Sequence, residues 1–318
     1  MRIGILGGAD IAYRMFVPAL LETEGAECAG VASNQPDRRE RFSKSFNTAV
    51  FENYDDLIDS EFVDAVYIPL PPALHFRWAE RALNAGKHVY LEKPSTTCYS
   101  DSLHLAELAA EKHLILQENY MFVYHSQLRT ILQMISAGKI GTPRLYKGTF
   151  GFPLREKDDF RYNDRLGGGG LLDAGGYVIK LASILLGESA KVTAADKAGV
   201  SGYDVDMFGA VTIENSEGRV FQGAYGMDCY YQCSLEVWGS KGKISANRIF
   251  TAPPGYTPAV RLETIEGTED ISLEPDNHFK QALKAFIAAE HDEALQKKMR
   301  DQLLQQARLV DAVRSFWR

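Results

Sequence analysis

The sequence predicts an α/β domain followed by an α+β domain that is built on an open, predominantly antiparallel sheet. In the first third of the chain, short β-rich runs alternate with amphipathic stretches, which is the pattern of a parallel sheet built from strand–helix–strand units. Farther along, β-type segments follow one another with Gly, Asn and Ser between them, as in antiparallel hairpins. The 318 residues suffice for two domains, which we place at 1–119 and 120–318.

The first domain is expected to contain five strands and five helices in alternation. The stretch from Ala73 to Ala85 shows the helical pattern, because Phe76, Ala79 and Leu83 recur at spacings of three and four and Gly86 can end the helix. The expected strands are Arg2 to Leu6, Glu27 to Ala32, Ala65 to Pro69, His88 to Glu92 and Leu114 to Gln117. The expected helices are Ile11 to Leu21, Pro36 to Ser45, Tyr54 to Ile58, Ala73 to Ala85 and Ser100 to Lys112.

The second domain is expected to begin with a helix from Tyr124 to Ala137 and to place another helix after the glycine run at 167–170. Five β-type segments follow, and the stretch from His278 to Trp317 shows a long helical pattern that breaks near His291. The β-type segments are Lys191 to Asp196, Asp206 to Ile213, Val220 to Tyr225, Cys233 to Trp238 and Gly242 to Asn247.

The composition excludes several classes of protein. Thirty-five basic side chains against 42 acidic ones give a net charge of −7, which does not suit a protein that binds nucleic acid or an anionic membrane through its charge. No apolar run approaches the roughly 18 residues of a membrane helix, and the first residues do not resemble a secretion signal. Four scattered cysteines are too few for a disulfide framework, so we expect a protein of the reducing cytoplasm.

No metal site is expected. Cys229 and Cys233 are four residues apart, but no His pair near them could supply the other two ligands of a zinc site. We expect these two side chains to be free thiols on a strand.

A glycine-containing turn lies between the first strand and the first helix. It comprises Gly7, Gly8, Ala9, Asp10 and Ile11, and Ala12 follows it. Small residues in such a turn permit a tight bend and a close approach of the backbone to a pyrophosphate, and the amides at the start of a helix attract anions. The turn therefore predicts a dinucleotide site. Since Ala9 and Ala12 occupy two of the three glycine positions of the fingerprint, a purely structural turn is the alternative.

The end of the second strand favours NADP(H) over NAD(H). NAD-binding folds usually hold the ribose hydroxyls with an acidic residue at this place, whereas this strand is followed by Ser33 and Asn34. Arg38 comes soon after, and a hydroxyl, an amide and a guanidinium would all accept a 2′-phosphate. The alternative is that Arg38 belongs to a solvated helix face.

Further candidates stand where two parallel strands end, which is where open α/β sheets bind ligands. Pro69, Leu70 and Pro71 follow the fourth strand, and Glu92 and Lys93 follow the fifth. A lysine beside a bound nicotinamide can hydrogen-bond a substrate oxygen or lower the pKa of a neighbouring acid by its charge. Lys93 is therefore the best catalytic candidate in the first domain.

The strongest group of candidates follows the glycine run of the second domain. If a helix begins near Gly169, Asp173 and Tyr177 are four residues apart and share one face, which makes a carboxylate and a phenol neighbours. Such a pair can carry acid–base chemistry. A buried tyrosine whose hydroxyl is satisfied by the aspartate is the structural alternative.

These motifs, in this order, resemble the glucose-fructose oxidoreductase/inositol dehydrogenase (Gfo/Idh/MocA) family, and the resemblance covers essentially the whole chain. Its residues are Gly7 to Ala12, Pro69 to His75, Gly86 to Pro94, Glu118 with Met121 to Gln127, and Gly167 to Tyr177. Compared with the family, Ser126 replaces the usual proline, and Gly8 stands where cysteine or another residue is more frequent. The resemblance implies a Rossmann domain with an open-faced sheet domain, and an NAD(P)(H)-dependent oxidoreductase that acts on CH–OH groups.

The resemblance also implies site residues. By the resemblance, Lys93 corresponds to the lysine of the family's motif, Asp173 to its carboxylate on a helix, and Tyr177 to its last catalytic position. Many members carry histidine at this last position. A tyrosine there is similar to the sugar 3-ketoreductases and to the dihydrodiol and xylose dehydrogenases. Arg161 and Tyr162 are candidate substrate contacts, with a loop role as the alternative. His75, like the strand-end residues above, is expected near the cofactor.

Hydride is then expected to move between the nicotinamide and a sugar or sugar-nucleotide carbon, with Tyr177 exchanging the hydroxyl proton and Lys93 assisting it. An NAD-dependent polyol or diol dehydrogenase is a second hypothesis. A dinucleotide-binding regulator without catalytic activity is a third hypothesis. The retention of Lys93, Asp173 and Tyr177 argues against it. The resemblance further implies a homodimer or homotetramer. The expected binding partner is a small-molecule sugar or sugar nucleotide, and no nucleic acid or membrane is expected.

Overall fold

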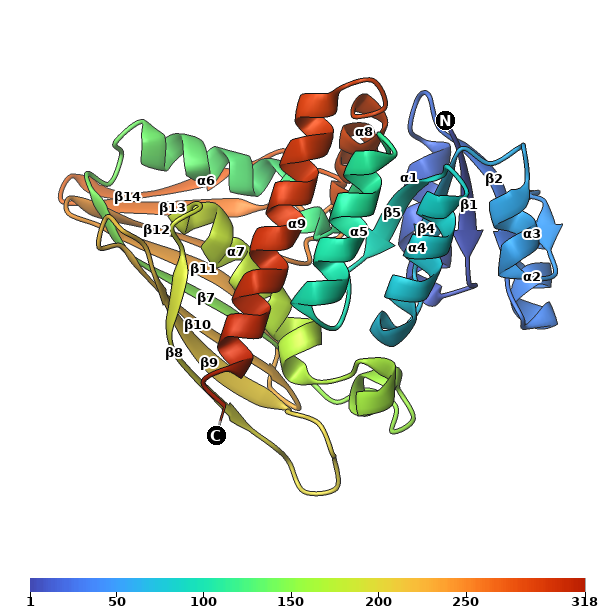
Figure 1. The fold of residues 1–318 in the computed structure, drawn as a ribbon. Coiled ribbons are helices and arrows are strands. Elements are labelled where there is room, and N and C mark those ends of the chain that lie inside the picture. The colour runs from blue at the N-terminus through green and yellow to red at the C-terminus, as the bar shows by residue number, and fades with distance from the viewer. Residues whose placement is uncertain (318) are drawn as a thin grey trace. The chain divides into compact units, whose positions relative to one another are not determined.

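The computed structural model describes residues 1–317 and divides the chain into two compact units. The first unit combines Met1–Asn119 with Phe279–Ala307, and the second combines Tyr120–His278 with the end of the chain from Arg308. The segment Phe279–Ala307, which we had placed in the second domain, thus packs with the first unit. Figure 1 shows the path of the chain and labels most of its α-helices and strands.

The first unit contains a parallel sheet of six strands in the order β3-β2-β1-β4-β5-β6. The strands are β1 (Arg2–Leu6), β2 (Glu27–Ala32), β3 (Val50–Phe51), β4 (Ala65–Ile68), β5 (His88–Glu92) and β6 (Leu116–Asn119). The helices are η1 (Ala12–Phe16), α1 (Val17–Leu21), α2 (Pro36–Phe46), α3 (Tyr54–Asp59), η2 (Pro72–Leu74), α4 (His75–Asn84), α5 (Tyr99–Glu111), α8 (His278–Ala288) and α9 (Glu293–Arg314), of which α9 continues into the second unit. The Rossmann-type α/β prediction is confirmed.

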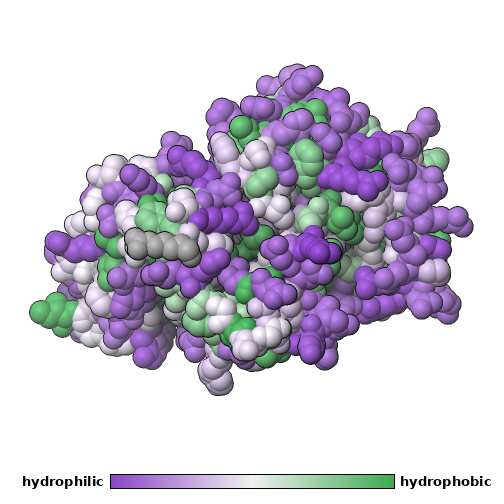
Figure 2. Space-filling model, turned by 60° about the horizontal axis from the view of Figure 1, so that its bottom comes forward, coloured by the Kyte–Doolittle hydropathy of each residue, from purple (hydrophilic) through white to green (hydrophobic). Residues whose placement is uncertain are grey.

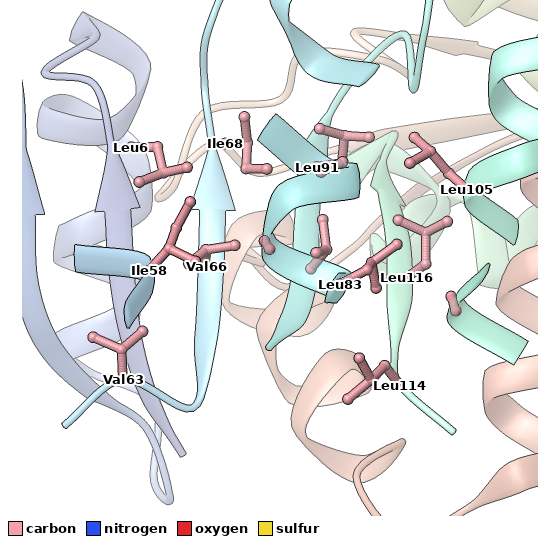
Figure 3. Packing of buried hydrophobic residues seen from close by; sticks show 14 of the residues in the cluster. Leu6, Ile58, Val63, Val66, Ile68, Leu83, Leu91, Leu105, Leu114 and Leu116 are labelled. Carbon is pink, nitrogen blue, oxygen red and sulfur yellow. The ribbon is translucent and has the colours of Figure 1, made fainter. Parts of the chain in front are cut away.

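Apolar side chains cover both faces of this sheet. On one face, Ile58 of α3, Leu83 of α4 and Leu105 of α5 pack against strand residues such as Val66 and Leu91 (Figure 3). On the other face, the ring of Phe16 stacks on Tyr67 with 3.7 Å between the ring centroids, and Phe286 of α8 packs edge-on against Tyr90. Burial of these side chains stabilises the sheet between two layers of helix and fixes the carboxyl ends of its strands.

The second unit contains a sheet of eight strands in the order β14-β13-β12-β11-β7-β10-β9-β8. Its strand pairs are antiparallel except for β7 and β10, so the predicted, largely antiparallel sheet is confirmed. The strands are β7 (Pro143–Phe152), β8 (Lys191–Ala198), β9 (Phe208–Glu214), β10 (Val220–Met227), β11 (Gln232–Gly239), β12 (Gly242–Asn247), β13 (Ala259–Thr264) and β14 (Gly267–Ser272). The helices are η3 (Met121–Tyr124), α6 (Ser126–Ser136), η4 (Phe160–Tyr162), η5 (Asp164–Leu166), η6 (Leu171–Gly175) and α7 (Gly176–Leu186).

Helix α7 is the core of the second unit, and all but one of its eleven residues are buried. It lies close to the sheet at a strand glycine, because a Cβ on Gly223 would collide with Cγ1 of Val178 in the helix. A Cβ on a second strand glycine, Gly148, would lie 2.6 Å from Phe221 Cζ, so this glycine leaves space for the phenylalanine ring. The helical segment Asp164–Leu186 is long and apolar enough to cross a membrane, longer than the sequence pattern suggested, but 89% of its most apolar window is buried in the unit. That burial is typical of a core helix.

Some elements differ from the expected ones. The two-residue β3, the central strand β7, the strand β13 and the edge strand β14 were not anticipated, and the strand expected at 114–117 is β6, two residues later. All four cysteines have free thiols, but only Cys233 of the expected strand pair lies on a strand, because Cys229 falls in the bend before β11. Over residues 1–317, no group of three or more His, Cys, Asp and Glu side chains is placed to hold a metal ion. The face of the molecule in Figure 2 is largely hydrophilic, with separate small apolar areas.

Candidate functional site

The glycine-containing turn has the geometry that its sequence predicts. Gly7 has a φ of +97°, which favours glycine, and its amide donates a hydrogen bond to the carbonyl of Ala32 at the end of β2. A Cβ on Gly7 would lie 2.7 Å from Leu70 Cδ2, and a Cβ on Gly8 would lie 2.7 Å from Arg38 Cβ. The turn is therefore packed between the loop after β4 and the start of α2, with no space for side chains.

The residues that follow the two glycines begin the first helix. Ala9 and Ile11 are half-buried, and the exposed carboxylate of Asp10 accepts a hydrogen bond from Arg41 over 2.8 Å. The Arg41 guanidinium also lies 3.6 Å from the centroid of the Tyr13 ring. Arg41 of α2, which packs on Tyr13 of η1, thus binds Asp10 at the helix start, where backbone amides would face an anion.

The end of β2 offers polar groups but no carboxylate. Ser33 is buried and its Oγ accepts a hydrogen bond from the Gln35 amide, while Asn34 is exposed. Arg39 donates to the carbonyl of Ser33, and the exposed Arg38 lies against Gly8. Two basic residues of α2 thus adjoin the expected dinucleotide site, and the binding of a 2′-phosphate by the exposed Arg38 stays a prediction.

The loops after β4 and β5 are joined by His75. Its imidazole is fully buried, with Nδ1 2.8 Å from the Pro94 carbonyl oxygen and Nε2 2.7 Å from that of Leu70. Burial lowers the pKa of His75 to about 4, so the ring is neutral at physiological pH and donates to only one of the two carbonyls. The structure thus gives His75 the role of fixing these loops. Pro69 is buried, and Leu70 and Pro71 are half-buried beside it.

The residue before the candidate lysine is the centre of a buried polar network. Glu92 Oε1 accepts hydrogen bonds from the Tyr67 hydroxyl over 2.7 Å and from the Asn119 side-chain amide over 2.6 Å. Asn119 in turn accepts one from the Tyr90 hydroxyl, and the amide of Lys93 donates to Glu92 Oε2. Burial raises the pKa of Glu92 despite these hydrogen bonds. Three strands therefore fix the backbone from which Lys93 projects.

In the second unit, the glycine run allows a close approach of backbone segments. Gly169 has a φ of +116°, and a Cβ there would lie 2.4 Å from Asp206 Oδ1, while one on Gly168 would lie 2.5 Å from the Arg161 carbonyl oxygen. Asp206 Oδ2 accepts a hydrogen bond from the Leu171 amide over 2.7 Å, and its backbone carbonyl accepts one from Gly170. Asp206 therefore holds the start of η6, a role that its sequence position does not reveal.

The candidate carboxylate Asp173 is paired with a predicted substrate contact. Arg161 Nε donates to Asp173 Oδ2 over 2.7 Å, and its Nη1 donates to Asp159 Oδ1 over 3.1 Å. All three side chains are largely buried, with at most 19% exposed. Burial alone would lower the pKa of Arg161, but the charges of Asp173 and Asp159 outweigh it and raise that pKa. Asp173 and Arg161 thus form part of one ionic group.

Tyr162 also has contacts within its loop. Its hydroxyl accepts a hydrogen bond from the Arg155 amide over 2.8 Å, and its ring lies 4.8 Å from that of Tyr203. The loop before the glycine run is thereby connected to the loop before β9. Contact of Arg161 or Tyr162 with a substrate stays a prediction.

Tyr177, in the first turn of α7, is surrounded by aromatic rings. The ring centroids of Tyr120, Phe122, Phe150 and Phe250 lie between 5.1 and 5.9 Å from that of Tyr177. Its hydroxyl lies 3.7 Å from Met121 Sδ, and only 6% of the residue is exposed. The four surrounding rings fix the orientation of the Tyr177 ring and therefore the position of its phenol oxygen. The sequence did not reveal this enclosure, because the rings come from η3 and the residue before it, from β7 and from the segment after β12.

Comparisons with known proteins agree with this arrangement. Residues 1–120 match the family described as "Oxidoreductase family, NAD-binding Rossmann fold", and residues 128–245 match the "GFO/IDH/MocA C-terminal domain". The chain is 39% identical to a dTDP-3,4-didehydro-2,6-dideoxy-alpha-D-glucose 3-reductase of Streptomyces violaceoruber, over 99% of this chain and 94% of that protein. It is 35% identical to a protein of the same name from Saccharopolyspora spinosa, over 98% of this chain and 96% of that one.

A solved structure is similar over the same extent. The 3-ketoreductase KijD10 of Actinomadura kijaniata, crystallised with NADP and TDP-benzene, superimposes with a TM-score of 0.95 and 37% identity, over 100% of this chain and 98% of that one. Structures of its variants exist in which a tyrosine is replaced by phenylalanine or a lysine by alanine or glutamate. This chain belongs to the GFO/IDH/MocA family of oxidoreductases, whose first domain is an NAD-binding Rossmann fold.

Proposed function

We propose that this protein is an NADPH-dependent 3-ketoreductase that reduces the C3 carbonyl of a dTDP-linked keto-deoxyhexose to a hydroxyl. Relatives named for this reaction match nearly the full length of the chain at 35–39% identity. The observation that carries the proposal concerns two residues. Lys93 and Tyr177 are separated by the same number of positions as the substituted lysine and tyrosine of the Actinomadura kijaniata enzyme.

The first unit fits a dinucleotide. The Gly7–Gly8 turn has no space for side chains, and the helix that follows presents its start beside Asp10. Ser33 and Arg38 adjoin this turn without a carboxylate at the end of β2, which supports NADP(H) over NAD(H). We assign the 2′-phosphate to Ser33, Asn34 and Arg38.

In the proposed reaction, the bound nicotinamide supplies a hydride to the carbonyl carbon. Tyr177 gives its phenolic proton to the carbonyl oxygen, so that the ketone gains one hydride and one proton and becomes an alcohol. The Lys93 ammonium favours the phenolate that remains, because a nearby positive charge stabilises the charged form of an acid. Solvent then returns a proton to Tyr177.

Asp173 has a positioning role in this scheme. Its carboxylate is held by Arg161 over 2.7 Å, at the start of the helix that carries Tyr177. A carboxylate close to a phenolate opposes its formation. We assign the opposing charge of Arg161 the role of offsetting this effect, so that Asp173 can orient the tyrosine or a substrate hydroxyl.

The proposal is tested by oxidation of NADPH by the purified protein, with dTDP-linked 3-keto-deoxyhexoses and the corresponding free keto-sugars as substrates. We expect turnover of a dTDP-linked ketone, with NADPH preferred over NADH. Turnover of unattached polyols or diols with NAD alone would favour the dehydrogenase hypothesis instead. Tight binding of the cofactor without turnover of any compound would favour the regulator.

We also propose that the protein is a homodimer or homotetramer that associates through the open face of its eight-stranded sheet. The half-buried or exposed residues on this face include small polar ones, such as Thr149 and Ser234, whose hydroxyls lie 2.7 Å apart, and the exposed Ala224. Small side chains on such a face allow a second copy to pack closely against it. Light scattering coupled to gel filtration tests this, and a monomer at micromolar concentration would contradict it.

A further inference from the structure

Arg248 occupies an unusual position at the end of a strand in the second unit. It follows β12 directly, and its φ of +52° is a left-handed conformation that is uncommon for residues other than glycine. Its amide donates a hydrogen bond to the Cys233 carbonyl of β11 over 2.6 Å. The backbone conformation turns the chain out of the sheet at this residue, and its side chain is exposed.

The guanidinium of Arg248 lies among aromatic rings. Its Cζ is 5.2 Å from the ring centroid of Tyr231 and 5.7 Å from that of Tyr256. Tyr230, next in the chain to Tyr231, is 88% exposed. A cation–π contact of this kind uses no hydrogen bond, so it leaves the N–H groups of the guanidinium available as donors.

Carboxylates do not neutralise this cation. Over residues 1–317, no side chain forms a salt bridge or a hydrogen bond with the Arg248 guanidinium. Two other arginines of the same unit are paired, since Arg219 bonds to Glu217 and Arg261 to Asp270. Arg248 is therefore a positive charge that is held by tyrosines and has free donors.

A short series of contacts connects this cluster with the surroundings of Tyr177. Tyr231 hydrogen-bonds through its hydroxyl to Thr251 Oγ1 over 2.7 Å, and Thr251 follows Phe250, whose ring lies 5.8 Å from that of Tyr177. Phe150, another neighbour of Tyr177, is the register partner of Cys233, whose carbonyl binds the Arg248 amide. The cation and the candidate acid thus lie at the same end of the sheet, within one unit.

We infer that Arg248, Tyr231 and Tyr256, with the exposed Tyr230, bind the nucleoside diphosphate part of the substrate. A guanidinium donates paired hydrogen bonds to phosphate oxygens, and tyrosine rings stack on a nucleobase. The sugar would then lie toward Tyr177. This inference rests on the proposed function, because a free sugar has no diphosphate for Arg248 to bind.

Titration calorimetry with thymidine diphosphate, in the presence of saturating NADP⁺, tests the inference. We expect Arg248→Gln to weaken binding of thymidine diphosphate at least about tenfold, since a lost charged hydrogen bond to phosphate has effects of this size. Tyr256→Leu is expected to weaken it about fivefold or more through lost stacking. Arg144→Gln is the matched control, because Arg144 is also exposed but lies at the opposite end of β7.

The outcomes separate two kinds of failure. If the wild-type protein binds thymidine diphosphate and both variants bind it as tightly, the assignment of this subsite is wrong and the proposed function stands. If the wild-type protein does not bind thymidine diphosphate but reduces free keto-sugars, the proposed nucleotide-sugar function is wrong and the subsite with it. If Arg248→Gln weakens NADP⁺ binding and lowers the melting temperature as well, Arg248 has a structural role, which also contradicts the inference.

Discussion

The side chain of Arg161 holds the carboxylate of Asp173 through a hydrogen bond of 2.7 Å from Nε to Oδ2. The same guanidinium binds Asp159, so the loop before the glycine run is fastened to the helical segment that leads to Tyr177. Because the three side chains are largely buried, neither carboxylate has ready access to water as a substitute partner. Arg161 is thus a link between the loop and the candidate acid.

Replacement of Arg161 by glutamine is expected to lower both stability and activity. Two neighbouring carboxylates would remain without their cation, which should lower the free energy of unfolding by about 1.5–3 kcal/mol. We also expect kcat to fall more than the affinity for NADPH, since Arg161 belongs to the second unit. Urea unfolding and steady-state kinetics measure these effects. Arg165→Gln, a change in the same loop at an exposed arginine, is the control and should be close to wild type.

Arg38 is expected to set the preference for NADPH. Arg38→Ala removes the guanidinium that we assign to the 2′-phosphate, so KM for NADPH should rise at least about tenfold while KM for NADH changes little. The ratio of kcat/KM for the two cofactors measures this directly. An equal loss with both cofactors would mean that Arg38 acts by supporting Gly8 rather than by binding phosphate.

Asp64 should contribute to stability in a defined pH range. The hydrogen bond from Arg2 lowers the pKa of Asp64 from 3.8 to about 2. Since the folded state holds this carboxyl with the lower pKa, its contribution is complete above about pH 4 and is lost as the pH falls toward 2. The pair is one-third exposed, so we expect only about 0.5–1 kcal/mol. Between pH 4 and pH 2, the free energy of unfolding should fall less for Asp64→Asn than for wild type. The control Asp204→Asn should lose as much stability as wild type over the same range.

Tyr225 offers a stabilising substitution. Its hydroxyl is buried without a hydrogen-bond partner among residues 1–317, and burial raises the pKa of this phenol. Tyr225→Phe removes a polar group that has no partner, so the free energy of unfolding should rise by about 1 kcal/mol. Tyr146→Phe is the matched control, because the buried Tyr146 hydroxyl interacts with Arg219 and its loss should be destabilising. A lower stability of Tyr225→Phe would show that its hydroxyl has a partner in solution.

The Rossmann-type half of the fold could be predicted well because its buried strands are short apolar runs between amphipathic helices. The central strand β7 of the second sheet was missed, because Lys147 and Gly148 interrupt its pattern of apolar residues. The edge strand β14 was missed for another reason. All its residues but Ile271 are exposed, so no alternation marks it.

The candidate site could be predicted only in part. Lys93, Asp173 and Tyr177 stand in motifs that the sequence shows. The residues that fix this part of the structure are distant in the chain. Asp206 binds the amide of Leu171 at the start of η6, and Phe250 packs against Tyr177. Contacts across such separations depend on strand register, which the residue pattern of one sequence does not determine.

The central claim is that the protein transfers hydride from NADPH to C3 of a dTDP-linked keto-deoxyhexose while Tyr177 supplies the proton. The most direct test uses NADPH deuterated at C4 of the nicotinamide and locates the label in the product by NMR, for wild type and Tyr177→Phe. We predict deuterium at C3 of the sugar with wild type and a rate at least about a hundredfold lower with Tyr177→Phe. Deuterium at another carbon, or near-normal turnover by Tyr177→Phe, would contradict the account.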